Sequence, residues 1–395
     1  MKRYLLFIFV ALILLCTGCQ NSSKDKLVIC TDTYLYPTVK DAVEKWKKEN
    51  REGSSIQTVI VKIPSDETAA EIKIAEIRTE IMAGDGPDLF IIRVPSYTVI
   101  PEDRPESLLF SNPEKAMYSD IFLPLDSYLE EFEYLDIDNC NQAILKAGQT
   151  EEGQMLLPLL YDYEACLFPV EENEESSSYP RSFEEILWNE QMRVAIHKQN
   201  SIIAFFSSLG SYADYKNEEL LVSKEDIKKT FELGLTRESS WNAVELNHVS
   251  FLDADLKHKS ESYNIYAVPN IYGGVTGRIQ TSAGINKNTR VADEAASFLD
   301  TYCEIFSTSA VASANGMFIE FSDQIINNLR TDSISEENIE DMIRMNNSIT
   351  DVRFYSMWDY YIADTFWKQY YGAQDPTLEA AIDEIYNKMQ MQMKE

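Results

Sequence analysis

Apolar positions follow two different periods in the first hundred residues. Short apolar runs at 27–31, 56–63 and 89–94 predict buried strands. Between them, at 37–50 and 67–83, apolar residues recur every three or four positions, which predicts amphipathic helices. The resulting order of strand, helix, strand, helix and strand is typical of a doubly wound α/β lobe with parallel strands.

The junction between the second helix and the third strand is the clearest local signal. Gly84 stands where a helix end needs a positive φ, and Asp85-Gly86-Pro87 has turn chemistry that cannot continue a helix. Ligands of parallel sheets bind beyond the carboxyl ends of the strands. The loops that follow the first and third strands are therefore the first places to look for function.

Both of those loops carry aromatic and polar side chains. Tyr34 and Tyr36 follow the first strand, and Arg93 and Tyr97 follow the third. Aromatic faces stack on sugar rings, while neighbouring polar groups can fix hydroxyls. The alternative is that these tyrosines are ordinary surface residues, since the chain has 22 tyrosines.

A second α/β set follows in the later chain. The extended apolar segment at 156–168, with Asp162 and Glu164 in its middle, predicts a strand that leaves one core and enters another. The segment at 137–147 is expected to be one helix, and the glycine-rich segment at 272–278 a hinge or a binding loop. Further strands are predicted at 244–252, 263–269 and 280–286, and further helices at 223–234, 292–306, 335–346, 356–371 and 377–393.

The amino terminus reads as an export signal. Lys2 and Arg3 precede an apolar run at 4–15, which is shorter than the about 20 residues that a membrane-spanning helix needs. The alternative is a short membrane anchor. Thr17-Gly18 before Cys19 resembles the lipobox of bacterial lipoproteins, in which that cysteine is lipidated. More than one acyl chain on Cys19 would hold a folded domain at the membrane surface.

Charge and cysteine content exclude several classes of function. The chain has 65 acidic and 35 basic residues, a net charge of −30, which repels phosphate backbones and argues against nucleic-acid binding. Cys30, Cys140, Cys166 and Cys303 lack CxxC spacing, so no zinc site is expected. We expect these cysteines to be buried free thiols, with disulfides as the alternative that export permits. No cofactor is expected.

Three stretches taken together resemble a known family. They lie at 79–90, at 157–161 and at 282–286, the last with the helix at 294–299 behind it. In order and spacing they resemble the extracellular solute-binding proteins of ABC importers, the group that includes maltose- and oligosaccharide-binding proteins. The resemblance implies a two-lobed α/β, periplasmic-binding-protein-like fold of type II, with crossing strands at the hinge and ligand held in the cleft.

The same resemblance implies a division of the chain and a set of binding residues. The expected parts are a signal peptide at 1–18, a lipidated tether at 19–25, an amino-terminal lobe at 26–160 with 278–305, and a carboxyl-terminal lobe at 161–277 with 306–395. Trp358 matches the tryptophan in the family's final helical segment, although a core tryptophan is the alternative. Matched by position are Tyr34, Tyr36, Arg93 and Tyr97 in the first lobe, Asp253 at the mouth of a second-lobe strand, and Tyr161 and Tyr272 at the crossings.

The function implied is capture, without catalysis, of a sugar or oligosaccharide outside the cell and its delivery to ABC permease subunits by a lipid-anchored monomer. A membrane-anchored glycoside hydrolase is the alternative from another class, because it needs only two placed carboxylates. The chain has 3 histidines that form no HExxH, and it has no GxSxG. A ligand-presenting sensor of the same fold is the third possibility.

Overall fold

The computed structural model describes residues 26–49, 56–94, 108–169, 182–188, 205–234, 245–248, 263–309, 316–320, 336–367 and 378–394. The expected signal peptide, the tether and Cys19 lie outside these ranges. Within them, no helix combines the length and the apolar composition that crossing a membrane would require.

The first lobe is built as the sequence pattern predicts. Its elements run β1 (Lys26–Asp32), α2 (Tyr36–Glu49), β2 (Gln57–Ile63), α3 (Glu67–Met82) and β3 (Leu89–Arg93). Strand β1 lies between β2 and β3 and is parallel to both, which confirms the doubly wound arrangement.

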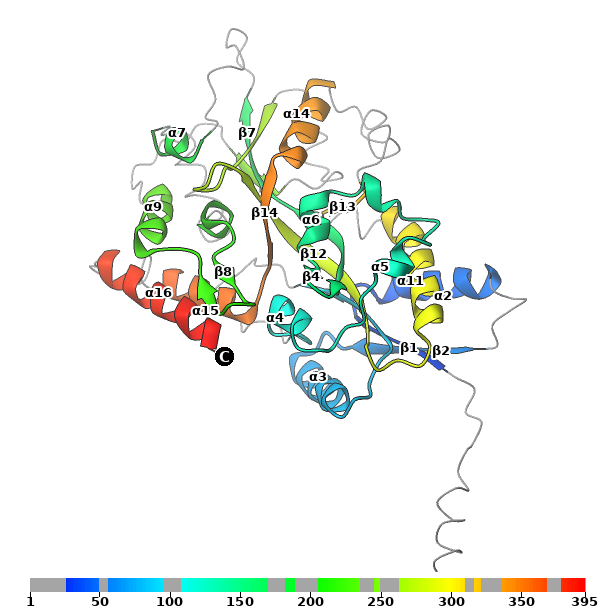
Figure 1. Ribbon diagram of the computed structural model, residues 1–395. Coiled ribbons are helices and arrows are strands. Elements are labelled where there is room, and N and C mark those ends of the chain that lie inside the picture. The colour runs from blue at the N-terminus through cyan, green and yellow to red at the C-terminus, as the bar shows by residue number, and fades with distance from the viewer. Residues whose placement is uncertain are drawn as a thin grey trace, which may run out of the picture.

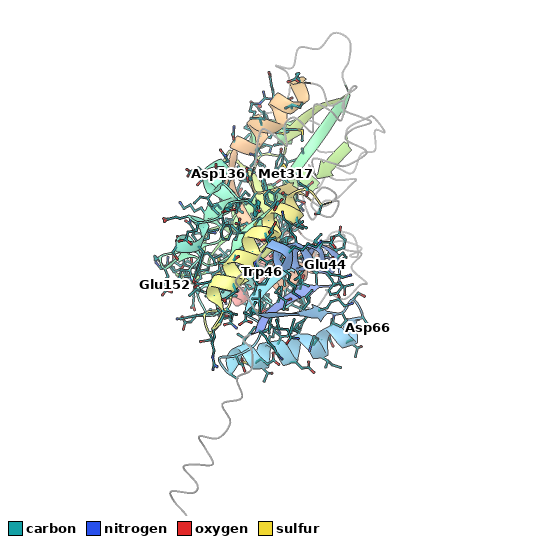
Figure 2. All side chains as sticks on the ribbon, turned by 90° about the vertical axis from the view of Figure 1, so that its right-hand side faces the viewer. Glu44, Trp46, Asp66, Asp136, Glu152 and Met317 are labelled. Atoms are coloured by element: carbon teal, nitrogen blue, oxygen red, sulfur yellow. The ribbon has the colours of Figure 1, made fainter. Side chains whose placement is uncertain are left out.

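Helix α2 packs on α11 (Ala292–Ser307), and Trp46 lies at that contact (Figure 2). The Trp46 indole N–H donates to Ser297 Oγ over 3.0 Å, and its ring meets Phe298 edge to face at 6.0 Å. The apolar stripe of α2 is thereby buried against a helix about 250 positions later in the chain. This contact joins the segments before and after the crossing strands into one lobe.

The junction after α3 has the predicted glycine end. Gly84 has φ of 77°, its N–H donates to Ile81 O over 3.0 Å, and the N–H of Asp85 donates to Glu80 O over 3.0 Å. This pair of bonds is a Schellman end, which caps the last carbonyls of the helix. The turn residue Asp88 then accepts the Val28 N–H over 2.7 Å, so the turn is fixed to β1.

One mixed sheet connects the two lobes. Its order is β13 (Met317–Phe318), β6 (Leu157–Asp162), β12 (Val275–Ile285), β3, β1 and β2, and β14 (Ile349–Phe354) also pairs with β12. The first half of β12 is parallel to β14, whereas its second half is antiparallel to β3 and β6. The eleven buried residues of β12 therefore pass from one body of the protein to the other (Figure 1).

The second lobe has a sheet of its own. Strand β7 (Glu164–Pro169) follows β6 directly and lies antiparallel between β10 (Glu245–His248) and β11 (Tyr263–Ala267). The extended segment at 156–168 thus leaves one sheet and enters another, as predicted. Helices α7 (Phe183–Trp188), α9 (Lys224–Gly234), α14 (Glu336–Asn347), α15 (Met357–Trp367) and α16 (Leu378–Lys394) lie in this half (Figure 1). The protein has a two-lobed α/β fold.

The remaining elements are short. They are α4 (Pro113–Met117), α5 (Asp126–Leu129), the 3-10 turn η1 (Ile137–Asn139), α6 (Gln142–Lys146), and the hairpins β4 (Gln149–Thr150) with β5 (Gly153–Gln154) and β8 (Ala213–Asp214) with β9 (Glu219–Leu220). Cys30, Cys140 and Cys303 are buried free thiols, as expected, whereas the side chain of the fourth cysteine, Cys166, lies outside what the structure describes.

One sequence-based prediction of local structure was wrong. The segment at 137–147 is not one helix: Cys140 pairs with Glu320, and the Asn141 side chain accepts the N–H groups of Ala143 and Ile144, both over 3.1 Å. A side chain that caps a helix cannot also lie inside one, so α6 starts afresh.

The glycine-rich segment at 272–278, predicted as a hinge or a binding loop, leads directly into a crossing strand. Its last four residues already belong to β12, where Gly277 permits close packing: a Cβ there would lie 2.7 Å from Ile144 Cδ1. Glycine in a strand marks such a close approach as readily as it marks flexibility. Strand β14 was not predicted at all.

Candidate functional site

The carboxyl ends of β1 and β3 form a preorganised polar edge. Asp32, the last residue of β1, accepts the N–H groups of Tyr34 and Leu35 through Oδ1 at 2.7 and 2.9 Å, and that of Arg93 through Oδ2 at 3.2 Å. One carboxylate therefore joins the loop after β1 to the last residue of β3. Asp32 was not among the residues that sequence analysis singled out, although its place at a strand end was visible.

Two of the predicted side chains, Tyr34 and Arg93, meet at this edge. The Arg93 guanidinium lies 4.8 Å from the centre of the Tyr34 ring and 4.0 Å from Asp32 Oδ2. Tyr36, at the start of α2, has the Lys62 ammonium 5.2 Å above its ring. The Tyr34 side chain is 38% exposed. The predicted grouping of Tyr34 and Arg93 is thus present.

This edge adjoins the strands that cross between the lobes. Val94 donates its N–H to Gln280 O of β12 over 2.8 Å, and the Gln280 amide donates to Asp162 Oδ2 over 3.0 Å. Asp162 ends β6 just before the chain enters the second lobe. The polar edge and the crossing strands are therefore linked through one residue, Val94, which directly follows Arg93.

A buried ionic cluster occupies the crossing itself. The Arg278 guanidinium donates two 2.7 Å bonds to Asp162 and lies 3.2 Å from Glu164 Oε1, with all three side chains under 8% exposed. Burial acts to lower the pKa of Arg278, but Asp162, Tyr355 and Glu164 outweigh it and hold that pKa well above its usual value. The sequence showed Asp162 and Glu164 as an acidic pair within an apolar run, but it did not show that Arg278 would be their cation.

Trp358 stands at the first turn of α15. Ser356 caps this helix: its hydroxyl accepts the Trp358 N–H over 3.2 Å, and its own N–H donates to Asp359 over 2.7 Å. The Trp358 ring is half-buried and meets Tyr361, 44% exposed, edge to face at 5.9 Å. The pair presents an aromatic surface at a rigid helix start.

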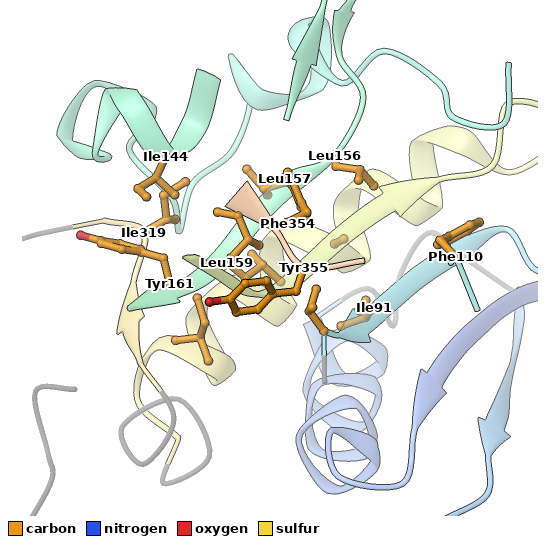
Figure 3. Packing of buried hydrophobic residues seen from close by; sticks show 14 of the residues in the cluster. Ile91, Phe110, Ile144, Leu156, Leu157, Leu159, Tyr161, Ile319, Phe354 and Tyr355 are labelled. Carbon is orange, nitrogen blue, oxygen red and sulfur yellow. The ribbon is translucent and has the colours of Figure 1, made fainter. Parts of the chain in front are cut away.

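The two residues expected at the crossings have different surroundings. Tyr272 is 53% exposed in the turn before β12, where its ring borders Gly210. Tyr161 is fully buried beside Ile144 and Ile319, and its hydroxyl bonds to Asn346 (Figure 3). Burial raises the pKa of Tyr161. In this arrangement Tyr161 is a core residue that offers no surface to a solute.

Two predicted binding residues are not described by the structure, and a hollow lies away from the polar edge. Tyr97 and Asp253 lie outside the described residues. A hollow of about 410 Å³ borders Glu49, Tyr128 and Tyr134, at the end of α2 opposite to Tyr36 and so at the other edge of the sheet. No group of three or more His, Cys, Asp or Glu side chains placed to hold a metal occurs in the described part of the chain.

Comparison with proteins of known structure identifies the fold. No model of a known protein family matches the sequence, and no curated protein matches it. Solved structures do. The sugar-binding protein MalE of Xanthomonas citri is 12% identical, with a TM-score of 0.58 and coverage of 93% of this chain and 97% of that one. The chain has the fold of an ABC-importer solute-binding protein.

Two further structures support the assignment of the solute-binding-protein fold. An ABC substrate-binding protein of Listeria monocytogenes, in complex with cycloalternan, is 12% identical, with a TM-score of 0.56 over 94% of this chain and 100% of that one. The galacto-N-biose/lacto-N-biose I-binding protein of Bifidobacterium longum is also 12% identical, with a TM-score of 0.56 over 93% and 95%. Both lobes are therefore included in each match.

Proposed function

We propose that the protein captures a sugar or oligosaccharide between its two lobes and delivers it to the permease subunits of an ABC transporter. The observation that carries this proposal is the likeness, over more than nine-tenths of the chain, to three kinds of structure: a sugar-binding protein, an ABC substrate-binding protein in complex with cycloalternan, and a galacto-N-biose/lacto-N-biose I-binding protein of an ABC transporter. The reaction class is binding alone, because capture requires no bond to be made or broken.

The strand edge of the first lobe supplies the chemistry that a saccharide needs. Tyr34 offers an aromatic face, and Arg93 offers a guanidinium whose charge is balanced by Asp32. Such a combination stacks on the apolar face of a sugar and donates hydrogen bonds to its hydroxyls. Trp358 and Tyr361 supply a second aromatic surface on the other lobe. Tyr272, Tyr97 and Asp253 remain candidates, whereas Tyr161 is left out because it is buried.

Binding would then act through a shift in the populations of open and closed forms. A ligand that touches both lobes favours the closed form by the difference between its affinities for the two forms. The crossing strands β6 and β12 are the elements about which the lobes would rotate. Docking of the closed form on a permease would follow outside the cell, with Cys19 as the lipid anchor and the protein acting as a monomer.

A thermal-shift screen tests the solute class. The chain is heated with a panel of mono- and oligosaccharides, and in parallel with peptides and polyamines. A ligand that binds only the folded state raises the melting temperature, by an amount set by its concentration relative to Kd. We expect a saccharide to give the largest rise. A rise with peptides or polyamines and none with any saccharide would refute the carbohydrate assignment.

Variants of the aromatic surfaces test the site. Tyr34→Ala and Trp358→Ala should each weaken the affinity for the identified saccharide by about tenfold or more, the loss of about 1.4 kcal/mol or more that a buried stacking contact carries. Tyr134→Ala is the matched control, since Tyr134 is 37% exposed and borders the hollow at the opposite edge. Unchanged affinity in Trp358→Ala would remove this residue from the site.

A further inference from the structure

A buried polar network holds the start of α15, the helix that carries Trp358. Ser356 and Asp359 form a capping box: the Ser356 N–H donates to Asp359 Oδ2 over 2.7 Å, and the Asp359 N–H donates to Ser356 Oγ over 3.4 Å. The Ser356 hydroxyl also accepts the Trp358 N–H over 3.2 Å. Trp358 therefore stands between the two members of the box, on backbone that side chains fix in place.

Asp359 connects this cap to β14 and to the segment before β8. Its Oδ1 lies 2.8 Å from the Tyr212 hydroxyl and is ion-paired with the Arg353 guanidinium of β14. Each of these three side chains is at most 4% exposed. The guanidinium lies 4.3 Å from the centre of the Tyr212 ring and 4.7 Å from that of Phe206. One carboxylate thus joins the helix start to a strand and to a tyrosine behind it.

Gln392 joins the same cap to α16, which packs on α15. Its side-chain amide donates to Ser356 Oγ over 3.1 Å and to the Tyr215 hydroxyl. Its Oε1 lies 2.8 Å from the Tyr212 hydroxyl, which can donate either to this oxygen or to Asp359. Gln392 is fully buried. The start of α15 is therefore bonded to three other parts of the second lobe.

A network of this kind contributes more to a unique arrangement than to stability. Taking an ion pair out of water is costly, and well-packed apolar side chains of similar volume often stabilise a core equally well. Hydrogen bonds of fixed direction instead select one position of the helix. Because 3.6 residues make one turn, a slip of α15 by a single residue would move the Trp358 ring by about 100° around the helix axis. The network opposes such a slip.

We propose that Arg353, Asp359 and Tyr212 are positioning residues, which hold Trp358 in its binding orientation before a solute arrives. All three are buried and act through the tryptophan. A ring held in one orientation loses less conformational entropy when a ligand stacks on it, so the affinity is higher. This inference rests on the proposed capture of a saccharide and deepens it, since it names the residues that preorganise the aromatic surface of the second lobe.

The first experiment is fluorine NMR of the full chain and needs no solute. The chain is labelled with fluorotryptophan, and Trp358→Phe assigns the resonance of Trp358. Tyr212→Phe keeps the ring beside Arg353 but removes the hydroxyl. We expect the Trp358 resonance of this variant to shift and broaden, because the ring samples more than one orientation, while the resonance of Trp46 in the first lobe stays as in the parent.

Tyr302→Phe is the matched control for this measurement. Tyr302 is also a fully buried tyrosine, and its hydroxyl lies 3.3 Å from Thr38 Oγ1 in the core of the first lobe. Its loss should leave the Trp358 resonance unmoved. Gln392→Met, which removes the amide that bonds to Ser356, provides a second test should Tyr212→Phe not fold. A Trp358 resonance that is unshifted and equally narrow in either network variant would overturn the proposal.

A double-mutant cycle with the saccharide identified by the thermal-shift screen then separates positioning from general damage. Tyr212→Phe should weaken the affinity about fivefold in the parent, the loss expected for one neutral hydrogen bond. In a Trp358→Ala chain the same change should cost less than about twofold, because no ring is left to position. Equal losses in both chains would overturn the proposal. If no saccharide binds the parent, capture fails as a function, and the fluorine resonance of Trp358 still decides the role of the network.

Discussion

Replacing Arg278 with alanine is expected to destabilise the protein more than any exposed charge change. The guanidinium makes two 2.7 Å bonds to Asp162 and lies 3.2 Å from Glu164, and these side chains are 7% and 1% exposed. Its removal would leave two carboxylates in the core without their cation. Breaking a buried ion pair by removing one partner costs about 3–5 kcal/mol, and with two carboxylates orphaned we expect the upper part of that range.

Two comparison variants set the scale for this loss. Lys224→Ala removes an ion pair to Asp383 whose side chains are 51% and 50% exposed, and such pairs contribute about 0–1 kcal/mol. Arg278→Lys keeps the positive charge but loses the planar fork that bonds both oxygens of Asp162. Its loss should lie between those of the other two variants.

The assay is urea unfolding at pH 7, followed by tryptophan fluorescence and analysed by linear extrapolation. The loss in Arg278→Ala should shrink at pH 5, because the orphaned carboxylates can then take up protons. A loss in Arg278→Ala no larger than that in Lys224→Ala would refute the reasoning, since it would show that the cluster is not held in a low-dielectric interior.

Two other predictions concern the core. Burial raises the pKa of the Cys30 and Cys140 thiols to about 12. Both thiols should therefore resist maleimide at pH 8 in the folded protein and react once it is denatured. Rapid labelling of the folded protein would contradict this. Gly148→Ala should cost about 1–3 kcal/mol or more, because its Cβ would lie 1.9 Å from the Leu156 carbonyl oxygen. Gly277→Ala, whose Cβ would meet side-chain atoms of Ile144 and Ile349 and no backbone atom, should cost less in the same urea assay. Equal losses in the two glycine variants would count against this distinction.

Local signals predicted the first lobe because its structure is mostly local. The βαβαβ order needs only the hydrophobic period and the turn at Gly84, both of which are written in consecutive residues. The passage of 156–168 from one sheet to another was likewise visible as an apolar run too long for a single strand. Structure that depends only on neighbouring residues could therefore be predicted from the sequence.

The errors arose where distant residues decide local structure. Asn141 ends one turn and starts the next because Ile319, far along the chain, accepts its N–H. Strand β14 exists because β12 offers it a partner. Neither cause is visible near the residues affected.

In the candidate site, too, some residues could be predicted from local sequence and others could not. Tyr34 and Arg93 were predicted because strand ends can be located from the pattern, and the structure brings them together. Tyr161 was assigned by position in the chain, but side-chain direction along a strand depends on pairing register, and its ring points into the core. The Asp162–Arg278 pair joins segments more than a hundred residues apart, so no sequence pattern could reveal it.

Small-angle X-ray scattering with and without a saturating saccharide tests the central proposal most directly. Capture between two lobes requires that the ligand draw them together, so the radius of gyration should fall when the saccharide binds. The same saccharide should leave the radius unchanged in a Tyr34→Ala, Trp358→Ala double variant. Binding of the saccharide, verified by calorimetry, with no change in the radius of gyration of the parent protein would contradict capture by closure.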